Sequence, residues 1–205
     1  LGLLLDIGVG MPPEPKVRAA IQAAAAAFAD SGAQVEPLPP FLTRAMLDGL
    51  DRFWRVRAWS DMVGLPSERL DRVLPYIRKW AEGGAGISGL DAFRGFSQIM
   101  EMRAATLAAC RGFDFVLAPT APLPAFAAEL ASPIDDPARP FEHICFTVPF
   151  NMSDQPAISL NCGYTRERLP IGLQIIGRRF DDLGVLKMAR LYEQVRPAQL
   201  PWPSF

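Results

Sequence analysis

The sequence NMSDQPAISLNCGYTRERLPIGLQIIGRRFDD, residues 151–182, decides most of what can be expected of the fold. It contains two apolar runs, PAISLNC and IGLQIIG, separated by a polar stretch. In the second run Ile171, Leu173 and Ile175 alternate with other residues, a pattern typical of a strand with one buried face. We therefore expect two strands joined by a turn, followed by a helix that Asp181 caps.

Outward from this stretch, strands and helices alternate. The opening run LGLLLDIGV is apolar throughout, which predicts a strand covered on both faces. Prolines then open a helix whose Val17, Ile21, Ala24 and Phe28 fall on one stripe, and FDFVLAP predicts a further buried strand. The predicted fold class is α/β, with a mixed sheet flanked by helices.

A helical segment interrupts this pattern. Residues 41–112 are rich in arginine and aromatic side chains, and we expect them to be inserted between the strands of a single domain, 1–205. Ser88 and Asp91 predict the capped start of the last helix in this segment. The residues of that helix expected to face the core are Leu90, Phe93, Phe96, Met100 and Leu107. The proline-rich stretch 119–140 is a long irregular segment, and such segments are often functional loops.

Composition limits the class of protein. Half of the 205 residues are hydrophobic and the net charge is −1, which suits a large core and excludes a strongly polarised or disordered chain. Cys110, Cys145 and Cys162 lie far apart without a C-x-x-C pair, so we expect neither a disulfide framework nor a metal site, and a cytoplasmic location. No apolar stretch reaches the roughly 18 residues of a membrane span.

Local motifs for catalysis are weak. His143 is the only histidine and follows Glu142, but a lone histidine is more often structural than part of a Ser-His-Asp triad. Ser88 belongs to neither an S-x-x-K nor a G-x-S-x-G motif, and the turn GGAGISG lacks the Gly-Lys-Ser/Thr ending of a phosphate loop. The run RFWRVRAW, residues 52–59, could bind nucleic acid or an acidic partner, and this partner-binding hypothesis predicts salt-sensitive affinity. The slight negative charge of the chain argues against nucleic acid.

Three segments, in order and with matching spacing, carry a family resemblance. FDFVLAPTAPLPAF resembles the strand and Pro-Thr turn of the amidase signature family. FTVPFNMSDQPAISLNCG resembles its Asn-x-x-Gly-x-Pro-Ala-x-Ser segment, and LPIGLQIIGRRFDD its Leu-Pro-x-Gly-Leu-Gln strand. Asp154 stands where the family usually has glycine, so we expect a left-handed backbone there, which Asp tolerates better than most residues.

The resemblance implies amide hydrolysis by a serine nucleophile, a bridging serine in a cis peptide and a lysine base. In the family these residues lie in the N-terminal half, near a Gly-Ser-Ser-Gly-Gly-Ser segment that this sequence lacks. We therefore expect the C-terminal portion of an amidase, inactive by itself, whose partners are the missing N-terminal half and a small-molecule amide. We expect no cofactor and, because one histidine and scattered thiols match no ligand spacing, no metal; a homodimer and a non-catalytic pseudo-amidase stay open.

The resemblance also implies substrate-lining residues. Counted back from Asn151, the family positions that line an acyl or glutamine pocket fall on Phe141, Ile144 and Val148. These three would share one face of a helix, which a core stripe explains equally well. Amidotransferase subunits that use glutamine have an acid at the position of Ile144, so glutamine is a poor fit here. Phe180 matches an aromatic residue near the substrate channel.

Overall fold

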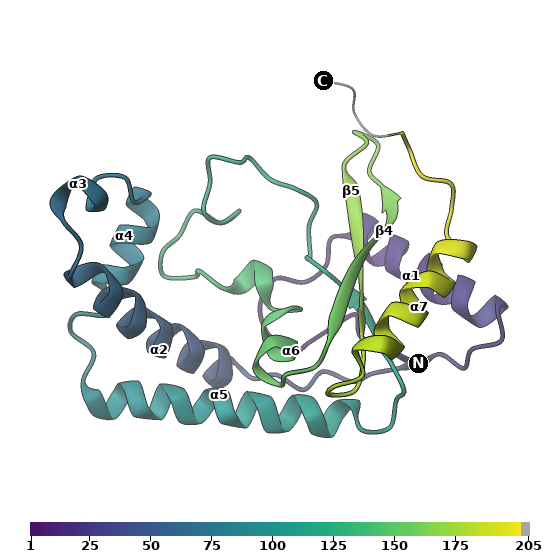
Figure 1. Ribbon diagram of the computed structural model, residues 1–205, viewed down its shortest axis with the longest axis horizontal. Helices are drawn as coiled ribbons and strands as arrows, with labels where there is room; N and C mark the ends of the chain where they lie inside the picture. The colour runs from purple at the N-terminus through teal and green to yellow at the C-terminus, as the bar shows by residue number, and fades with distance from the viewer. Residues whose placement is uncertain (202–205) are drawn as a thin grey trace.

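The computed structural model describes residues 1–201, so the last four residues of the predicted domain lie outside the described part. Five strands form one sheet in the order β2-β1-β3-β5-β4, with helices against both faces (Figure 1). The elements are β1 (Gly2–Leu3), α1 (Pro15–Asp30), β2 (Glu36–Pro37), α2 (Arg44–Val63), α3 (Ser67–Leu70), α4 (Pro75–Glu82), α5 (Gly89–Cys110), β3 (Val116–Pro119), the 3-10 helix η1 (Glu142–Ile144), α6 (Val148–Met152), β4 (Ala157–Tyr164), β5 (Pro170–Ile176) and α7 (Asp182–Val195).

The sheet is mixed, as predicted. β1 pairs in parallel with β2 and β3, whereas β5 pairs antiparallel with β3 and β4. The opening strand is shorter than its apolar run suggested. The Asp6 carboxylate accepts a hydrogen bond from the Gly8 amide at 2.9 Å, and this local turn ends the extended backbone.

One face of the sheet is covered by α1 and α7. The predicted stripe of α1 is buried, and it packs on Leu173 and Ile175 of β5. The rings of Phe28 and Tyr192 stack with their centroids 5.4 Å apart, which joins the two helices. Asp181 caps α7 as predicted, accepting a hydrogen bond from the Gly184 amide at 3.0 Å.

The other face is covered by α6 and by the long helices α2 and α5 (Figure 1). Ser88 caps α5 as predicted, but the predicted inward face of α5 is wrong. Leu90, Phe93, Phe96 and Met100 are between 39% and 68% exposed, and Leu107 is half-buried. The residues that α5 does bury are Gly95, Ile99, Met102, Thr106 and Cys110.

The close approach of α2 to α5 explains this rotation. A methyl group at Gly95 would lie 2.7 Å from the carbonyl oxygen of Gly49, so the two backbones nearly touch at this point. Only a face of small residues permits that distance. Leu90, Phe93 and Met100 of the bulky apolar stripe are therefore left exposed, although this stripe is the stronger signal in the sequence. Phe96 is only partly covered, with its ring centroid 5.5 Å from that of Phe53 in α2.

Candidate substrate-binding site

The carboxyl ends of the parallel strands β1 and β3 lie at one edge of the sheet. In open α/β sheets this edge is where ligands bind. Two irregular segments leave the strands here, residues 4–14 after β1 and residues 120–141 after β3. The Met11 amide donates a hydrogen bond to the carbonyl of Glu142 at 2.9 Å and so joins the first segment to η1, which follows the second.

Segment 120–141, the predicted long loop, is held by the helical insertion. The Tyr76 hydroxyl of α4 donates to the carbonyl oxygen of Asp136 at 3.1 Å, and the Arg55 guanidinium of α2 donates to that of Pro137. Arg55 is fixed in turn by the Asp51 carboxylate, 2.8 Å from its Nε. These directed bonds hold a segment without secondary structure of its own in one place.

A second anchor lies directly after this segment. Both oxygens of the Glu142 carboxylate accept hydrogen bonds from the Arg44 guanidinium, at 2.7 and 3.1 Å. The Glu142 side chain is 4% exposed, whereas that of Arg44 is half-exposed. The hydrogen bond to Glu142 raises the pKa of Arg44 above its usual value. Because a buried carboxylate requires a partner, this pair fixes η1 against the start of α2.

Of the predicted substrate-lining residues, Phe141 lies in an aromatic cluster. Its ring meets those of Trp54 and Trp80 edge-on, with centroids 5.7 and 5.8 Å away. Ile144 is half-buried and packs against the main core, in which Val148 is 4% exposed. None of the three lines the cavities of about 200, 300 and 400 Å³ that are described below. Val148 is therefore a core residue in this structure, which is the alternative that the sequence left open.

These three residues do not share one helix, and that part of the prediction is wrong. Phe141 precedes the 3-10 helix η1 and Val148 begins α6. Pro149 gives the reason, because it has no amide hydrogen to donate to the carbonyl of Cys145 and so interrupts a continuous helix.

Phe180 lies apart from the other three, in the turn between β5 and α7. Its side chain is 80% exposed and its φ is 66°, a left-handed backbone that is unusual for an aromatic residue. The Arg179 guanidinium carbon lies 4.9 Å from the centroid of its ring. Phe180 thus presents an apolar surface that the described residues do not cover.

Two hydroxyl groups meet at the end of β3. The Oγ atoms of Thr120 and Ser159 are 2.6 Å apart, on the same face of the sheet. They bend over Gly172, where a methyl group would lie 2.7 Å from the Thr120 Oγ1 and 3.0 Å from the Ser159 Oγ. Neither hydroxyl was predicted as a site residue, although both residues lie in the quoted Pro-Thr and Pro-Ala-x-Ser segments.

A cavity of about 400 Å³ lies in the first half of segment 120–141. Its walls include Leu123, Phe126, Leu130 and His143, with alanines and prolines between them. The imidazole of His143 meets the Phe126 ring edge-on, with centroids 5.9 Å apart. Burial lowers the pKa of His143, which keeps the imidazole neutral at pH 7. Its Nδ1 is buried without a hydrogen-bond partner among the described residues.

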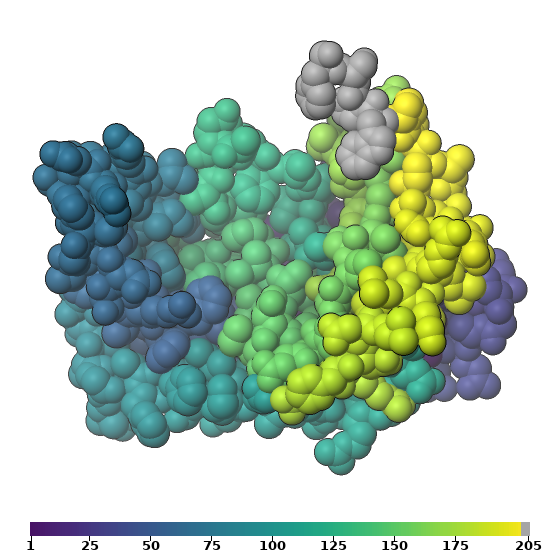
Figure 2. All heavy atoms as spheres, viewed as in Figure 1, coloured from purple at the N-terminus to yellow at the C-terminus, as the bar shows by residue number. Residues whose placement is uncertain are grey.

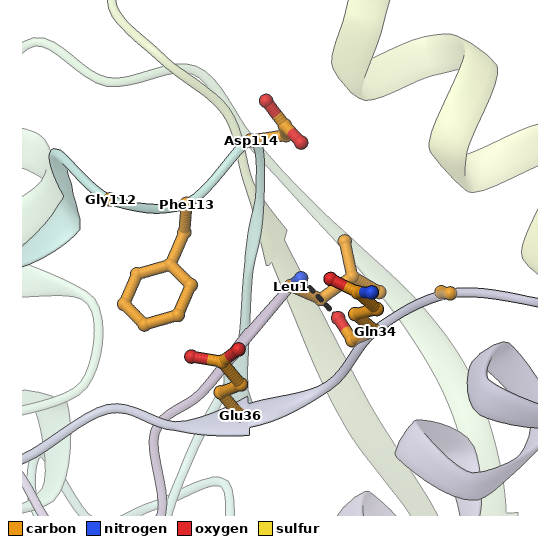
Figure 3. A pocket seen from close by; sticks show the side chains of 7 residues that line it. Leu1, Gln34, Glu36, Gly112, Phe113 and Asp114 are labelled. Carbon is orange, nitrogen blue, oxygen red and sulfur yellow. Dashed lines mark hydrogen bonds between the residues drawn. The ribbon is translucent and has the colours of Figure 1, made fainter.

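Two further cavities are smaller. One of about 200 Å³ lies along residues 5–13 and reaches Arg18 and Phe146. Another of about 300 Å³ lies at the opposite, amino edge of β1 and β3 (Figure 3). Glu36 and Asp114 project beside it, and the Leu1 amine donates to the carbonyl of Gln34. That edge is not the one where α/β sheets bind ligands.

Activated nucleophiles are not found in residues 1–201. The three cysteines are buried, and burial raises the pKa of Cys110 and Cys162 to about 11 and that of Cys145 to about 12, so the thiols stay protonated. Within this range no hydrogen bond joins a serine to a lysine or to His143. No group of three His, Cys, Asp or Glu in the described part of the chain could hold a metal ion.

Part of the arginine- and aromatic-rich run 52–59 is used inside the fold. Arg55 bonds to Asp51 and to two carbonyl groups, and Trp54 packs on Phe141. Arg52 donates to the Gln98 side chain at 3.3 Å. In residues 1–201 no helix has both the length and the apolar composition needed to cross a bilayer.

Asp154, which stands where the amidase signature family usually has glycine, has the left-handed backbone that was predicted for it. Its φ is 56°, in the left-handed region. Its carboxylate pairs with Arg103 of α5 at 2.6 Å and with Arg179, which follows β5, at 3.1 Å. An aspartate therefore gives this turn two ion pairs that a glycine could not make.

Comparison with known proteins agrees with this picture. The sequence profile of the Amidase family matches residues 2–186. The chain is 48% identical over 84 residues to a glutamyl-tRNA(Gln) amidotransferase subunit of Thermodesulfovibrio yellowstonii, a match that covers 41% of the chain and 17% of that protein. The corresponding protein of Brevibacillus brevis is 48% identical over 83 residues, covering 40% and 16%.

Solved structures match over nearly the whole chain. A bacterial aryl acylamidase of the amidase signature family superposes with a TM-score of 0.78 and 25% identity, over 95% of this chain and 43% of that one. A 6-aminohexanoate cyclic dimer hydrolase has the same fold, with a TM-score of 0.76 and 24% identity over 96% and 45%. The chain thus spans less than half of each relative. Because the family profile covers most of its residues, the chain belongs to the Amidase family.

Proposed function

We propose that this chain is the C-terminal part of an amidase that hydrolyses a carboxylic amide C–N bond. The serine nucleophile, the bridging cis serine and the lysine base lie upstream of Leu1 in this proposal. The described residues supply part of the sheet and part of the substrate-binding wall. The observation that carries the proposal is the family match over residues 2–186, together with the likeness in fold to an aryl acylamidase over 95% of the chain.

The side chains of residues 1–201 are compatible with catalytic groups that lie upstream of Leu1. The three thiols are held protonated, and Lys16, Lys79 and Lys187 are all exposed on helices. Binding a substrate without an activated nucleophile gives little rate. We therefore expect the 205-residue chain alone to release no ammonia from amides.

We propose further that Phe141, Ile144 and Phe180 contribute to the substrate-binding wall, and that Val148 supports this wall from the core. Ile144 is half-buried beside the core and has no group that could pair with an ammonium. Burying that charge unpaired costs several kcal/mol, which argues for an uncharged apolar amide rather than glutamine. The resemblance to amidotransferase subunits supports ammonia transfer as the alternative, and glutamine-dependent turnover would favour it.

The test uses the full-length polypeptide that contains this chain and measures ammonia release from hexanamide and glutamine. We expect hexanamide to be the better substrate, and Ile144→Asp to lower kcat/KM for hexanamide about tenfold, because a partly desolvated carboxylate would then face apolar substrate. Ile87→Asp is the matched control, a half-buried isoleucine in the turn before α5, and should leave kcat/KM unchanged. Equal kinetics in both variants would remove Ile144 from the substrate-binding wall, and no hydrolysis of any amide would refute the proposed activity.

A further inference from the structure

The cavity of about 400 Å³ in segment 120–141 has the size of a small-molecule site, for which about 300–1,000 Å³ is usual. It is lined by residues 121, 123–128 and 130 and by His143, and we call it the loop cavity. Figure 1 shows this segment arching between α4 and β5, and Figure 2 shows it as a teal-green ridge at the upper centre of the molecule. The loop cavity begins directly after Thr120, at the sheet edge where the parallel strands end.

The lining of the loop cavity selects for uncharged, apolar groups. No carboxylate, ammonium or guanidinium lines it, and leucine, phenylalanine, alanine and proline supply most of its surface. His143 is the one titratable residue in the wall. The remainder of the lining is apolar, so the cavity offers no charged partner to a ligand. A concave wall lined mainly by hydrophobic and aromatic side chains is typical of a ligand pocket.

The segment that forms the loop cavity is held at both ends. After the cavity, Asp136 and Pro137 are bonded to Tyr76 and Arg55 of the helical insertion. Before it, the Thr120 amide donates to the carbonyl of Gly172 in β5 at 2.9 Å. A cavity in a segment anchored in this way is largely preformed, which lowers the entropic cost of binding.

We propose that the loop cavity binds the apolar acyl or aryl group of the amide substrate. This inference rests on the proposed amidase function and assigns its substrate class, an uncharged amide with a medium-length alkyl or a phenyl group. The imidazole of His143, which meets the Phe126 ring edge-on, forms part of the wall against which this group packs. A substrate with an ammonium group on the acyl chain is disfavoured, because no residue of the cavity wall can pair with that charge.

Filling the loop cavity tests the proposal. In the full-length polypeptide, Ala128→Trp places an indole at the wall, and Ala138→Trp places the same side chain at an exposed position of the same segment outside it. Dissociation constants for hexanamide and 6-aminohexanamide are measured by ligand-observed NMR titration. We expect Ala128→Trp to weaken hexanamide binding at least about tenfold and Ala138→Trp to leave it within about twofold. The unsubstituted protein should bind 6-aminohexanamide at least about tenfold more weakly than hexanamide.

A second variant keeps the test decisive if Ala128→Trp does not fold. Leu130→Asp adds a carboxylate to the wall at a residue that is 38% exposed, and it should reverse the preference between the two ligands. Equal affinity for hexanamide in the unsubstituted protein and in both cavity variants would overturn the proposal. So would equal binding of the two ligands to the unsubstituted protein.

Ammonia release separates this inference from the proposed function. If the unsubstituted protein binds hexanamide in the loop cavity but releases no ammonia, hydrolysis fails and the binding site stands. If it hydrolyses hexanamide and Ala128→Trp leaves KM unchanged, the amidase activity stands and the loop cavity is not the acyl site. If hexanamide is neither bound nor hydrolysed, both proposals fail.

Discussion

On the face of the sheet covered by α1 and α7, the contacts are almost entirely apolar, with Ile21, Phe28 and Leu173 fully buried. On the opposite side, where α2 and α4 meet segment 120–141, directed polar bonds hold the chain, among them the Arg44–Glu142 pair and the Arg55 contacts. We call these the scaffold face and the anchored side. Apolar contacts are not directional and tolerate small shifts of a side chain, whereas a bidentate ion pair fixes the positions of both partners. The anchored side, which holds the loop cavity, is therefore the part built for fixed geometry.

The largest loss of stability should come from a substitution on the scaffold face. Ile21→Asp places an unpaired charge at a fully buried position, where it should lower the free energy of unfolding by about 4 kcal/mol or more and remove most soluble protein. Thermal unfolding of the full-length polypeptide measures the loss. Ala23→Asp, at an exposed position of the same helix, is the control and should unfold like the unsubstituted protein. Equal behaviour of the two variants would contradict the burial of this stripe.

A smaller loss of stability is expected from a substitution on the anchored side. Arg44→Met leaves the Glu142 carboxylate buried with only the more distant Arg139, 3.8 Å away. Removing one partner of a fully buried pair costs about 3–5 kcal/mol, and we expect about 2 kcal/mol because Arg44 is half-exposed. The double variant Arg44→Met/Glu142→Met should recover part of this loss, as urea unfolding would show. Strictly additive losses would mean that the pair is not coupled.

The contrast between the two regions also shows what could be predicted from the sequence. On the scaffold face, periodicity identified the α1 stripe, the alternation in β5 and the cap at Asp181, because each signal is local and apolar burial follows it. On the anchored side, the partner of Glu142 lies 98 positions away in the sequence, and no local pattern indicates Arg44. The buried face of α5 was predicted wrongly for the same reason. The close approach of Gly49 to Gly95 decides which face is buried, and no local pattern in the sequence indicates that contact. The helix assumed for residues 141–148 failed at Pro149, a signal that was visible in the sequence.

The smallest losses of stability should come from Asp154, which pairs with Arg103 of α5 and with Arg179 after β5. Asp154→Gly keeps the left-handed backbone and loses two half-exposed ion pairs, so we expect a loss of about 1 kcal/mol or less. Asp154→Val loses the same ion pairs and adds backbone strain, because a β-branched residue is poorly tolerated at a φ of 56°, for about 1–3 kcal/mol in all. Differential scanning calorimetry compares the two variants. A valine variant as stable as the glycine variant would show that the backbone here relaxes freely.

The central claim is that this chain builds the sheet and the substrate-binding wall while the reacting groups lie outside it. Labelling the full-length polypeptide with a fluorophosphonate, which modifies activated serines, and locating the adduct by peptide mass spectrometry tests this most directly. We predict a single adduct on a serine upstream of Leu1, formed more slowly in the presence of hexanamide. An adduct on Ser159 or on any other serine within residues 1–205 would contradict the claim.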